Sequence, residues 1–236
     1  MRKLCLLIAL TGVLASYQCF ALTVNVVRNA GYYGAVANEA EGGEFTVTAT
    51  DPSNPLFQNI IAHYDSSTMV NGGFETFCLD INVPLYPNPQ GATVTPTGVS
   101  MGVAWLYNQF VKQSLAGYIW APGGSAAAGG TGTGRANSAF MLQNAIWELE
   151  GQSGYDVGAA AYYVGLATAH FGSLAAAEAA ANGAFQIDQL VLTYPAGSGN
   201  LSQPMLAFVP DGGATVMLLG LALGSFCFVS RKMRLV

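Results

Sequence analysis

One thiol in the middle of the chain is a candidate reactive group. Of the four cysteines in the sequence, Cys5 and Cys19 fall in an expected signal peptide and Cys227 falls in an expected membrane-spanning tail. Cys78 is then the only cysteine of the mature domain, and it has no partner there for an intramolecular disulfide. A lone thiol in an exported protein is a buried small hydrophobic group, a dimer link or a reactive group.

Gln143 is the second residue of chemical interest, because it interrupts an apolar stripe. At helical spacing, Ala139, Gln143, Ile146 and Trp147 share one face. Burying the amide of Gln143 without a hydrogen bond would cost roughly a few kcal/mol. We therefore expect this side chain to have a polar partner.

The two residues lie in short motifs with a recognisable arrangement. Phe77-Cys78-Leu79 is an aromatic-Cys-apolar triplet, and residues 142–147 read Leu-Gln-Asn-Ala-Ile-Trp, 65 residues further on. Together they resemble the thioester domains of bacterial surface adhesins, in which a strand cysteine is linked to a helix glutamine. The resemblance covers roughly residues 74–150.

The resemblance implies an autocatalytic reaction between the two side chains. The thiolate of Cys78 would attack the carboxamide of Gln143, release ammonia and leave an internal thioester that an amine can open. Trp147 would shield the bond from water, while Asp80 and Glu148 are candidates for assisting proton transfer. In the alternative, Cys78 packs in the core, Gln143 hydrogen-bonds a neighbouring backbone and Trp147 is an ordinary core aromatic residue.

Other chemistry has little support in the sequence. The only histidines, His63 and His170, lie in no recognisable catalytic motif, which argues against a Cys-His protease. The acidic residues are scattered without the spacing of metal ligands. We expect neither an enzyme nor a cofactor nor a metal site.

The residue pattern predicts the elements that would position the pair. Segments rich in β-branched and aromatic residues predict strands, and apolar residues at helical spacing predict helices. The expected strands are 23–27, 45–50, 76–81 and 187–193; the expected helices are 101–116, 136–150 and 157–181, the last interrupted by Gly165 and Gly172. Residues 122–134 form a small-residue loop. The expected class is α+β: a strand-rich, sandwich- or barrel-like domain with a helical insertion.

Composition and charge exclude several classes of protein. With 52% hydrophobic residues, 9% charged residues and 29 glycines, the chain fits a loop-rich globular domain rather than a disordered chain or a plain helical bundle. Between Leu22 and Val209, three basic residues face twelve acidic ones, a formal charge of −9. Because phosphate binding needs clustered Lys and Arg, this domain should not bind nucleic acid.

The first 21 residues have the layout of a secretory signal peptide. Arg2 and Lys3 precede an apolar stretch over residues 4–15, and the small residues Cys19 and Ala21 flank Phe20. We expect cleavage after Ala21 and an ectodomain over residues 22–200. A lipoprotein signal, with Cys19 acylated, fits less well because the residues before Cys19 are not small.

The last segment, 209–236, combines three parts of a sorting signal. An uncharged apolar run over residues 214–230 is just long enough for a transmembrane helix, and the basic cluster after it should stay cytoplasmic. A buried core helix is the alternative. The motif before the run is Val209-Pro210-Asp211-Gly212-Gly213. The whole segment resembles the PEP-CTERM-like signals handled by exosortases, in the variant with Val-Pro-Asp in place of Pro-Glu-Pro.

These patterns predict an exported protein of the cell envelope or surface, anchored at least transiently in the cytoplasmic membrane. The resemblances imply processing by an exosortase-type enzyme near Pro210, a link to exopolysaccharide or biofilm matrix, and an amine-bearing surface or matrix acceptor for the thioester. The two candidate functions are a covalent adhesin or cross-linker and a non-reactive structural protein of the envelope or matrix.

Overall fold

A computed structural model describes residues 22–28, 32 and 43–210. The chain divides into two compact units, of which Phe20–Val209 contains every element below and the other comprises Met1–Cys19 and Pro210–Val236. The expected signal peptide, the expected membrane helix over 214–230, and Asp211, Gly212 and Gly213 lie outside the described residues. Among the described residues, no helix has the length and apolar character needed to span a membrane.

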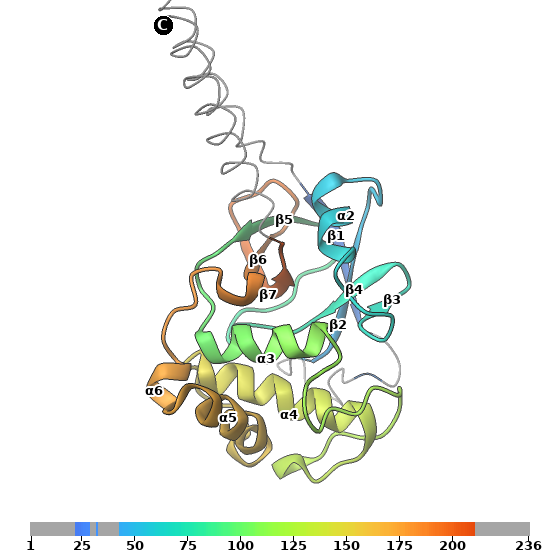
Figure 1. Ribbon diagram of the computed structural model, residues 1–236. Helices are drawn as coiled ribbons and strands as arrows, with labels where there is room; N and C mark the ends of the chain where they lie inside the picture. The colour runs from blue at the N-terminus through green and yellow to red at the C-terminus, as the bar shows by residue number, and fades with distance from the viewer. Residues whose placement is uncertain (1–21, 29–31, 33–42, 211–236) are drawn as a thin grey trace, which may run out of the picture. The chain divides into compact units, whose positions relative to one another are not determined.

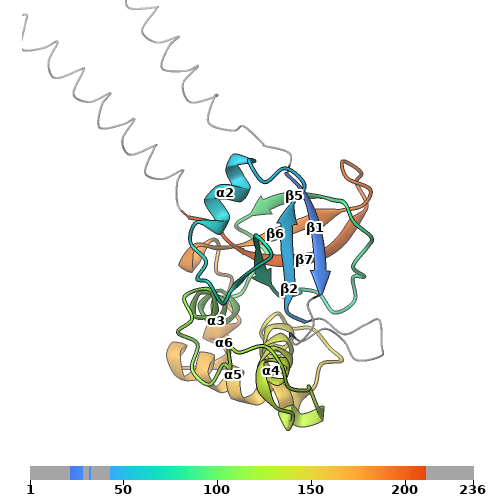
Figure 2. The ribbon, with the colours of Figure 1, turned by 90° about the vertical axis from the view of Figure 1, so that its right-hand side faces the viewer.

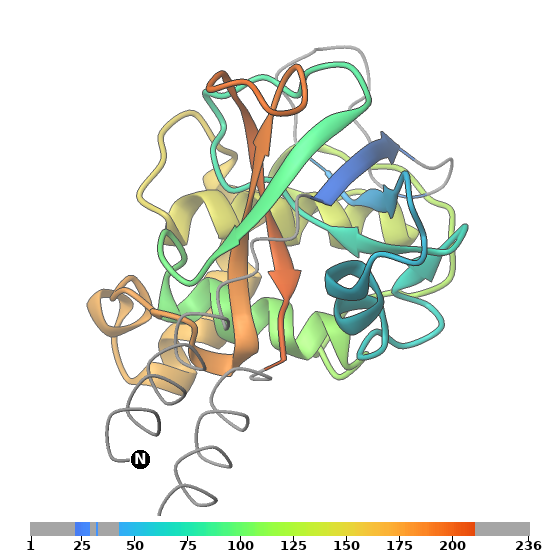
Figure 3. The same ribbon diagram turned by 90° about the horizontal axis from the view of Figure 1, so that it is seen from above.

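Seven strands form one sheet in which every neighbouring pair is antiparallel. In sheet order they are β3 (Met69–Val70), β4 (Gly73–Thr76), β2 (Phe45–Ala49), β1 (Leu22–Arg28), β5 (Gln90–Thr95), β6 (Ile187–Thr193) and β7 (Leu201–Phe208). Seen from above, green β5 lies between blue β1 and orange β6 (Figure 3). The strand-rich α+β class is confirmed.

The sheet curves until its β7 edge meets the chain that follows β4. Leu79 N–H donates to Pro204 O at 2.9 Å, and Leu206 N–H donates to Phe77 O at 3.3 Å. Between these bonds, Cys78 forms an isolated antiparallel bridge with Met205. The predicted strand 76–81 is therefore wrong in its bounds: β4 ends at Thr76, and residues 77–79 leave β2 and pair with β7 instead.

Four helices fall between β5 and β6 and pack together below the sheet (Figures 1 and 2). They are α3 (Met101–Val111), α4 (Gly134–Leu149), α5 (Val157–Phe171) and α6 (Leu174–Ala177); a further helix, α2 (Pro55–Ile61), follows β2. This is the expected helical insertion. α3 begins where Ser100 Oγ accepts from Val103 N–H, and α5 begins where Asp156 Oδ1 accepts from Ala159 N–H.

The predicted helix 157–181 is divided at one of its two glycines. Gly172 adopts a left-handed conformation with φ of 82° and ends α5, a position that favours glycine. Gly165 lies inside α5 and interrupts nothing. The sequence therefore located the break correctly at Gly172 and wrongly at Gly165.

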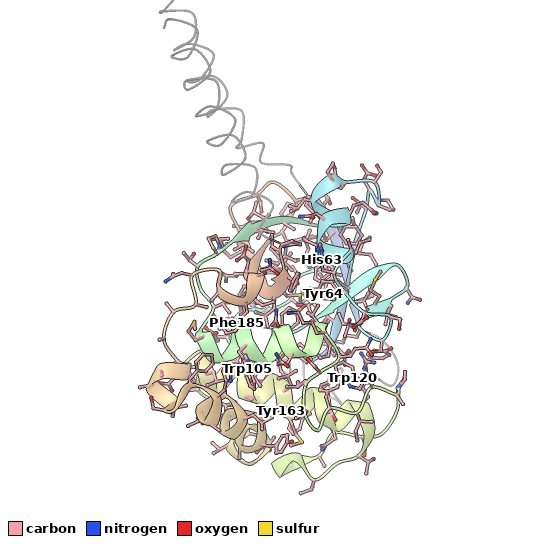
Figure 4. The ribbon with its side chains drawn as sticks, viewed as in Figure 1. His63, Tyr64, Trp105, Trp120, Tyr163 and Phe185 are labelled. Carbon is pink, nitrogen blue, oxygen red and sulfur yellow. The ribbon has the colours of Figure 1, made fainter. Side chains whose placement is uncertain are left out.

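Aromatic residues join the helical layer to the sheet at the place where the chain changes strand partner. The ring of Phe77 meets the rings of Tyr107 and Phe110 on α3 edge-on, with centroids 6.4 and 5.1 Å apart. The Tyr107 hydroxyl lies 2.8 Å from that of Tyr64, a residue labelled in Figure 4, and donates to the Glu75 carbonyl. All four aromatic side chains are buried. This packing fixes the backbone on both sides of Thr76.

Candidate functional site

The structure brings the two predicted reactants together. Gln143 is completely buried on α4, and its amide meets the backbone of Cys78 with two hydrogen bonds. Gln143 Nε2 donates to Cys78 O at 2.8 Å, and Cys78 N–H donates to Gln143 Oε1 at 3.0 Å. The amide is therefore held in one orientation against the residue whose thiol would attack it.

A third hydrogen bond comes from Gly43, two residues before β2. Gly43 N–H donates to Gln143 Oε1 at 3.1 Å, so two backbone donors converge on one side-chain oxygen. The expectation that Gln143 needs a polar partner is met by groups that no side-chain motif reveals. Gly43 and Cys78 are 35 residues apart and come together because β2 pairs with β4.

The Cys78 thiol is buried and free of any disulfide. Burial raises its pKa to about 12, while a hydrogen bond from Gly43 N–H and the positive charge of Arg28 act in the opposite direction. The thiol is therefore protonated at neutral pH, and any attack by its sulfur requires that proton to move during the reaction.

Trp147 lies one turn after Gln143 on α4 and is 4% exposed. Its indole Nε1 is buried and has no hydrogen-bond partner among the described residues. The predicted apolar stripe is present, since Ala139 and Ile146 are also fully buried. A shielding role for Trp147 stays a prediction.

The two acidic candidates have other surroundings. Asp80 Oδ1 accepts from Asn82 N–H at 2.8 Å, which closes a local turn. Burial and then the negative charge of Glu178 raise the pKa of Glu148, which follows Trp147 on α4. Neither carboxyl has a described hydrogen bond to Cys78 or Gln143, so proton transfer through them has no geometric support.

Sequence reasoning missed a buried ion pair beside the site. Arg135, in the first turn of α4, donates from Nε to both oxygens of Glu44, at 3.1 and 3.0 Å, and from Nη2 to Oε1 of the same carboxylate. Its remaining bonds reach the carbonyls of Ser67 and Trp120, the latter on the loop between α3 and α4 (Figure 4). The Tyr118 hydroxyl donates to Glu44 Oε2 at 2.7 Å.

This ion pair has all its principal groups satisfied. Burial lowers the pKa of Arg135, but the hydrogen bonds and the charge of Glu44 outweigh that effect and raise it. One signal could have pointed to it: Arg135 is one of only three basic residues in the domain, and it directly precedes the predicted helix that carries Gln143.

A second buried carboxyl, Glu75, was also missed. It is fully buried on β4, where the Thr46 hydroxyl donates to its Oε1 and its Oε2 has no hydrogen-bond partner among the described residues. Burial, followed by the negative charge of Glu44, raises the pKa of Glu75 to about 8. Glu75 is consequently protonated at neutral pH.

The histidines have aromatic neighbours rather than catalytic ones. His63 stacks on Phe208 with centroids 5.5 Å apart, and His170 stacks on Trp105 at 4.4 Å. In the part of the chain that the structure describes, no cluster of three His, Cys, Asp or Glu side chains could hold a metal ion.

Comparison with known proteins identifies the C-terminal segment. Residues 209–233 match the VPDSG-CTERM motif. This motif indicates an exported protein at the surface or membrane, handled by an exosortase-like sorting enzyme. No curated protein and no solved structure matches the chain.

Proposed function

We propose that this exported protein is a covalent surface adhesin or matrix cross-linker, which acts through an internal thioester between Cys78 and Gln143. One observation carries the proposal: a buried free cysteine holds the carboxamide of a buried glutamine against its own backbone with hydrogen bonds of 2.8 and 3.0 Å. Proximity and fixed orientation are what an intramolecular acyl transfer needs most.

The reaction balances without a further reagent. The Cys78 sulfur bonds to Gln143 Cδ, the bond from Cδ to Nε2 breaks, and the thiol proton leaves on the nitrogen as part of ammonia. A primary amine on a target then attacks Cδ, forms an amide and regenerates the thiol. The product joins the domain covalently to a surface or matrix component that presents an amine.

Sorting is consistent with this use. A protein delivered to the envelope by an exosortase-type enzyme meets other cells and matrix polymers, where a permanent bond resists flow and dilution. We propose anchoring through residues 214–230 and processing near Pro210 as the route by which the domain is presented.

A non-reactive structural protein is the second candidate, and a specific observation favours it. Both polar atoms of the Gln143 amide already have hydrogen-bond partners, and burial raises the pKa of the Cys78 thiol to about 12. A satisfied amide beside an un-ionised thiol would also serve simply to fasten α4 to residues 77–79.

Intact mass separates the two candidates. The mass of the purified protein is compared with those of Cys78→Ala and Gln143→Ala, all three carrying the same chain ends. The thioester predicts that only the unsubstituted protein is lighter than its sequence by one ammonia, and that methylamine adds to it while exposing one thiol.

The non-reactive candidate predicts a different result. All three proteins would then have their sequence masses, and Cys78 would be alkylated after denaturation without any amine treatment. That result would exclude the thioester and leave the structural role.

A further inference from the structure

Two backbone N–H groups point at the single atom on which negative charge would develop during thioester chemistry. Gln143 Oε1 lies 3.1 Å from Gly43 N and 3.0 Å from Cys78 N, and Gln143 is completely buried. An oxyanion hole needs donors about 2.7–3.1 Å from the position that the oxyanion will occupy, in a site that excludes water, and these two donors already converge on the oxygen that would carry the charge.

We propose that the N–H groups of Gly43 and Cys78 form an oxyanion hole that activates the Gln143 carbonyl, both for formation of the thioester and for its opening by an amine. The proposal rests on the proposed thioester function and adds to it the groups that lower the barrier. Gly43 is assigned a catalytic role that it performs through its backbone N–H.

The geometry fits the steps of the reaction. When the Cys78 sulfur adds to Gln143 Cδ, the carbonyl becomes a tetrahedral centre whose negative charge rests on Oε1, between the two donors. Nε2, which donates to Cys78 O, is held on the other side as the group that leaves. The thiol proton passes to this nitrogen, ammonia departs, and the carbonyl re-forms with its oxygen still in the hole.

The hole compensates for a poor nucleophile. Because burial holds the thiol in its protonated form, the reaction depends on stabilising the adduct rather than on a preformed thiolate. The Gly43 N–H also acts to lower the pKa of the Cys78 thiol, although burial outweighs that effect.

Neighbouring residues position Gly43 rigidly. Glu44, the next residue, is bound by Arg135 on the same helix as Gln143, and Phe45 pairs with Thr76 in the sheet. Gly43 is thus held to α4 by two contacts. One is the ion pair between the adjacent Glu44 and Arg135, and the other is its own hydrogen bond to Gln143. Glu44 and Arg135 are positioning residues for the hole.

Opening by an amine uses the same groups. Attack of the amine on the thioester carbon again places negative charge on the oxygen of Gln143, and departure of the Cys78 sulfur restores a carbonyl. A substitution that removes one donor should therefore slow both steps.

A matched pair of variants tests the proposal. Gly43→Pro removes the N–H, whereas Gly43→Ala keeps it. Because Gly43→Ala keeps the N–H, we expect Gly43→Pro to form the thioester and to react with methylamine about 100-fold more slowly than Gly43→Ala, the usual effect of losing one oxyanion donor. Mass spectrometry follows both the loss of ammonia and the gain of methylamine.

The outcomes distinguish the hole from the thioester itself. If the unsubstituted protein keeps its ammonia, the proposed function fails and the hole fails with it. If the unsubstituted protein carries the thioester and Gly43→Pro forms and opens it at unchanged rates, the thioester stands and the hole is overturned.

A measurement on the unsubstituted protein covers the case in which Gly43→Pro does not fold. With Gln143 labelled at Cδ, we expect two scalar couplings to that carbon in the thioester form, one from the amide nitrogen of Gly43 and one from that of Cys78, each through its hydrogen bond. Absence of both couplings from the thioester form would overturn the proposal.

Discussion

Glu44 and Arg135 form a fully buried ion pair that ties the start of β2 to the first turn of α4. The pair is the only salt bridge between described residues, and it lies next to both Gly43 and the loop that carries Trp120. We therefore expect substitutions of Glu44 or Arg135 to change the free energy of unfolding.

Removing one partner of this pair should be costly. Arg135→Met leaves the Glu44 carboxylate buried without its cation, and we expect the free energy of unfolding to fall by about 3–5 kcal/mol. Urea unfolding of the full chain measures the loss. Lys112→Met, at an exposed position after α3, is the control and should change stability by less than about 0.5 kcal/mol.

The two halves of the pair should not act independently. Because the double variant Glu44→Leu/Arg135→Met leaves no unpaired charge, its loss should be smaller than the sum of the two single losses. Additive losses would show that the contact between Glu44 and Arg135 is unimportant to the fold.

Because the pKa of the buried Glu75 carboxyl is raised, we expect the domain to lose stability as pH rises. The pKa of Glu75 is about 8 in the folded chain against an ordinary value of 4.5, so the folded state binds the proton more tightly. The contribution is fully present below about pH 4.5 and declines up to about pH 8, with a slope of at most about 1.4 kcal/mol per pH unit. The charged groups near Glu75 are Glu44, whose own pKa burial also raises, and Arg135.

Glu75→Gln is the variant that isolates this effect, because the amide cannot ionise. Urea midpoints measured between pH 5 and 9 should fall less steeply for Glu75→Gln than for the unsubstituted protein. Parallel curves would contradict the assignment of the slope to Glu75.

Replacement of Gly165 and of Gly172 by alanine should change the stability of the domain in opposite directions. Gly165→Ala should stabilise the domain by about 0.5–1 kcal/mol, because Gly165 is inside α5 and a Cβ there would meet no atom within 4 Å. Gly172→Ala should destabilise it by about 1 kcal/mol, since φ is 82° at that residue. Thermal unfolding of the two variants compares them directly, and equal shifts would contradict the conformational argument.

Deleting residues 211–236 should release the domain from the membrane into the periplasm or medium. The deletion keeps Val209, whose N–H donates to Gln186 O at 2.7 Å and belongs to the fold. Fractionation followed by immunoblotting measures the change. Pro210→Ala, which keeps the apolar run, should stay in the membrane with its tail unprocessed; a truncated chain that fractionated with the membrane would show that the tail is no anchor.

The sequence predicted several helices and strands, but not the way in which the strands pair. β1, β2, β6 and α4 lie within a few residues of the predicted segments, and α3 begins where predicted but ends at Val111 rather than at residue 116. β3, β5, β7 and α2 were missed. In β7, Pro204 interrupts the pattern, and proline is rare in strands. Yet Pro204 lacks only the donor; its carbonyl accepts the N–H of Leu79.

The site could be predicted only in part, for a related reason. Cys78 and Gln143 were selected by residue type, whereas Gly43 acts through a backbone N–H that every residue but proline carries. Glu44 and Arg135 are 91 residues apart, and no short spacing connects them. Long-range strand pairing brings these groups together, and a single sequence does not display that pairing.

The closure of the sheet at β7 also has a mechanical meaning. β7 is the last strand before Pro210, and it is bonded along one side to β6 and along the other to residues 77–79. A pull along the axis of β7 would load these roughly perpendicular hydrogen bonds in shear. They would then share the tension and have to break together, so the strand that leads into the tail is held on both sides against extraction.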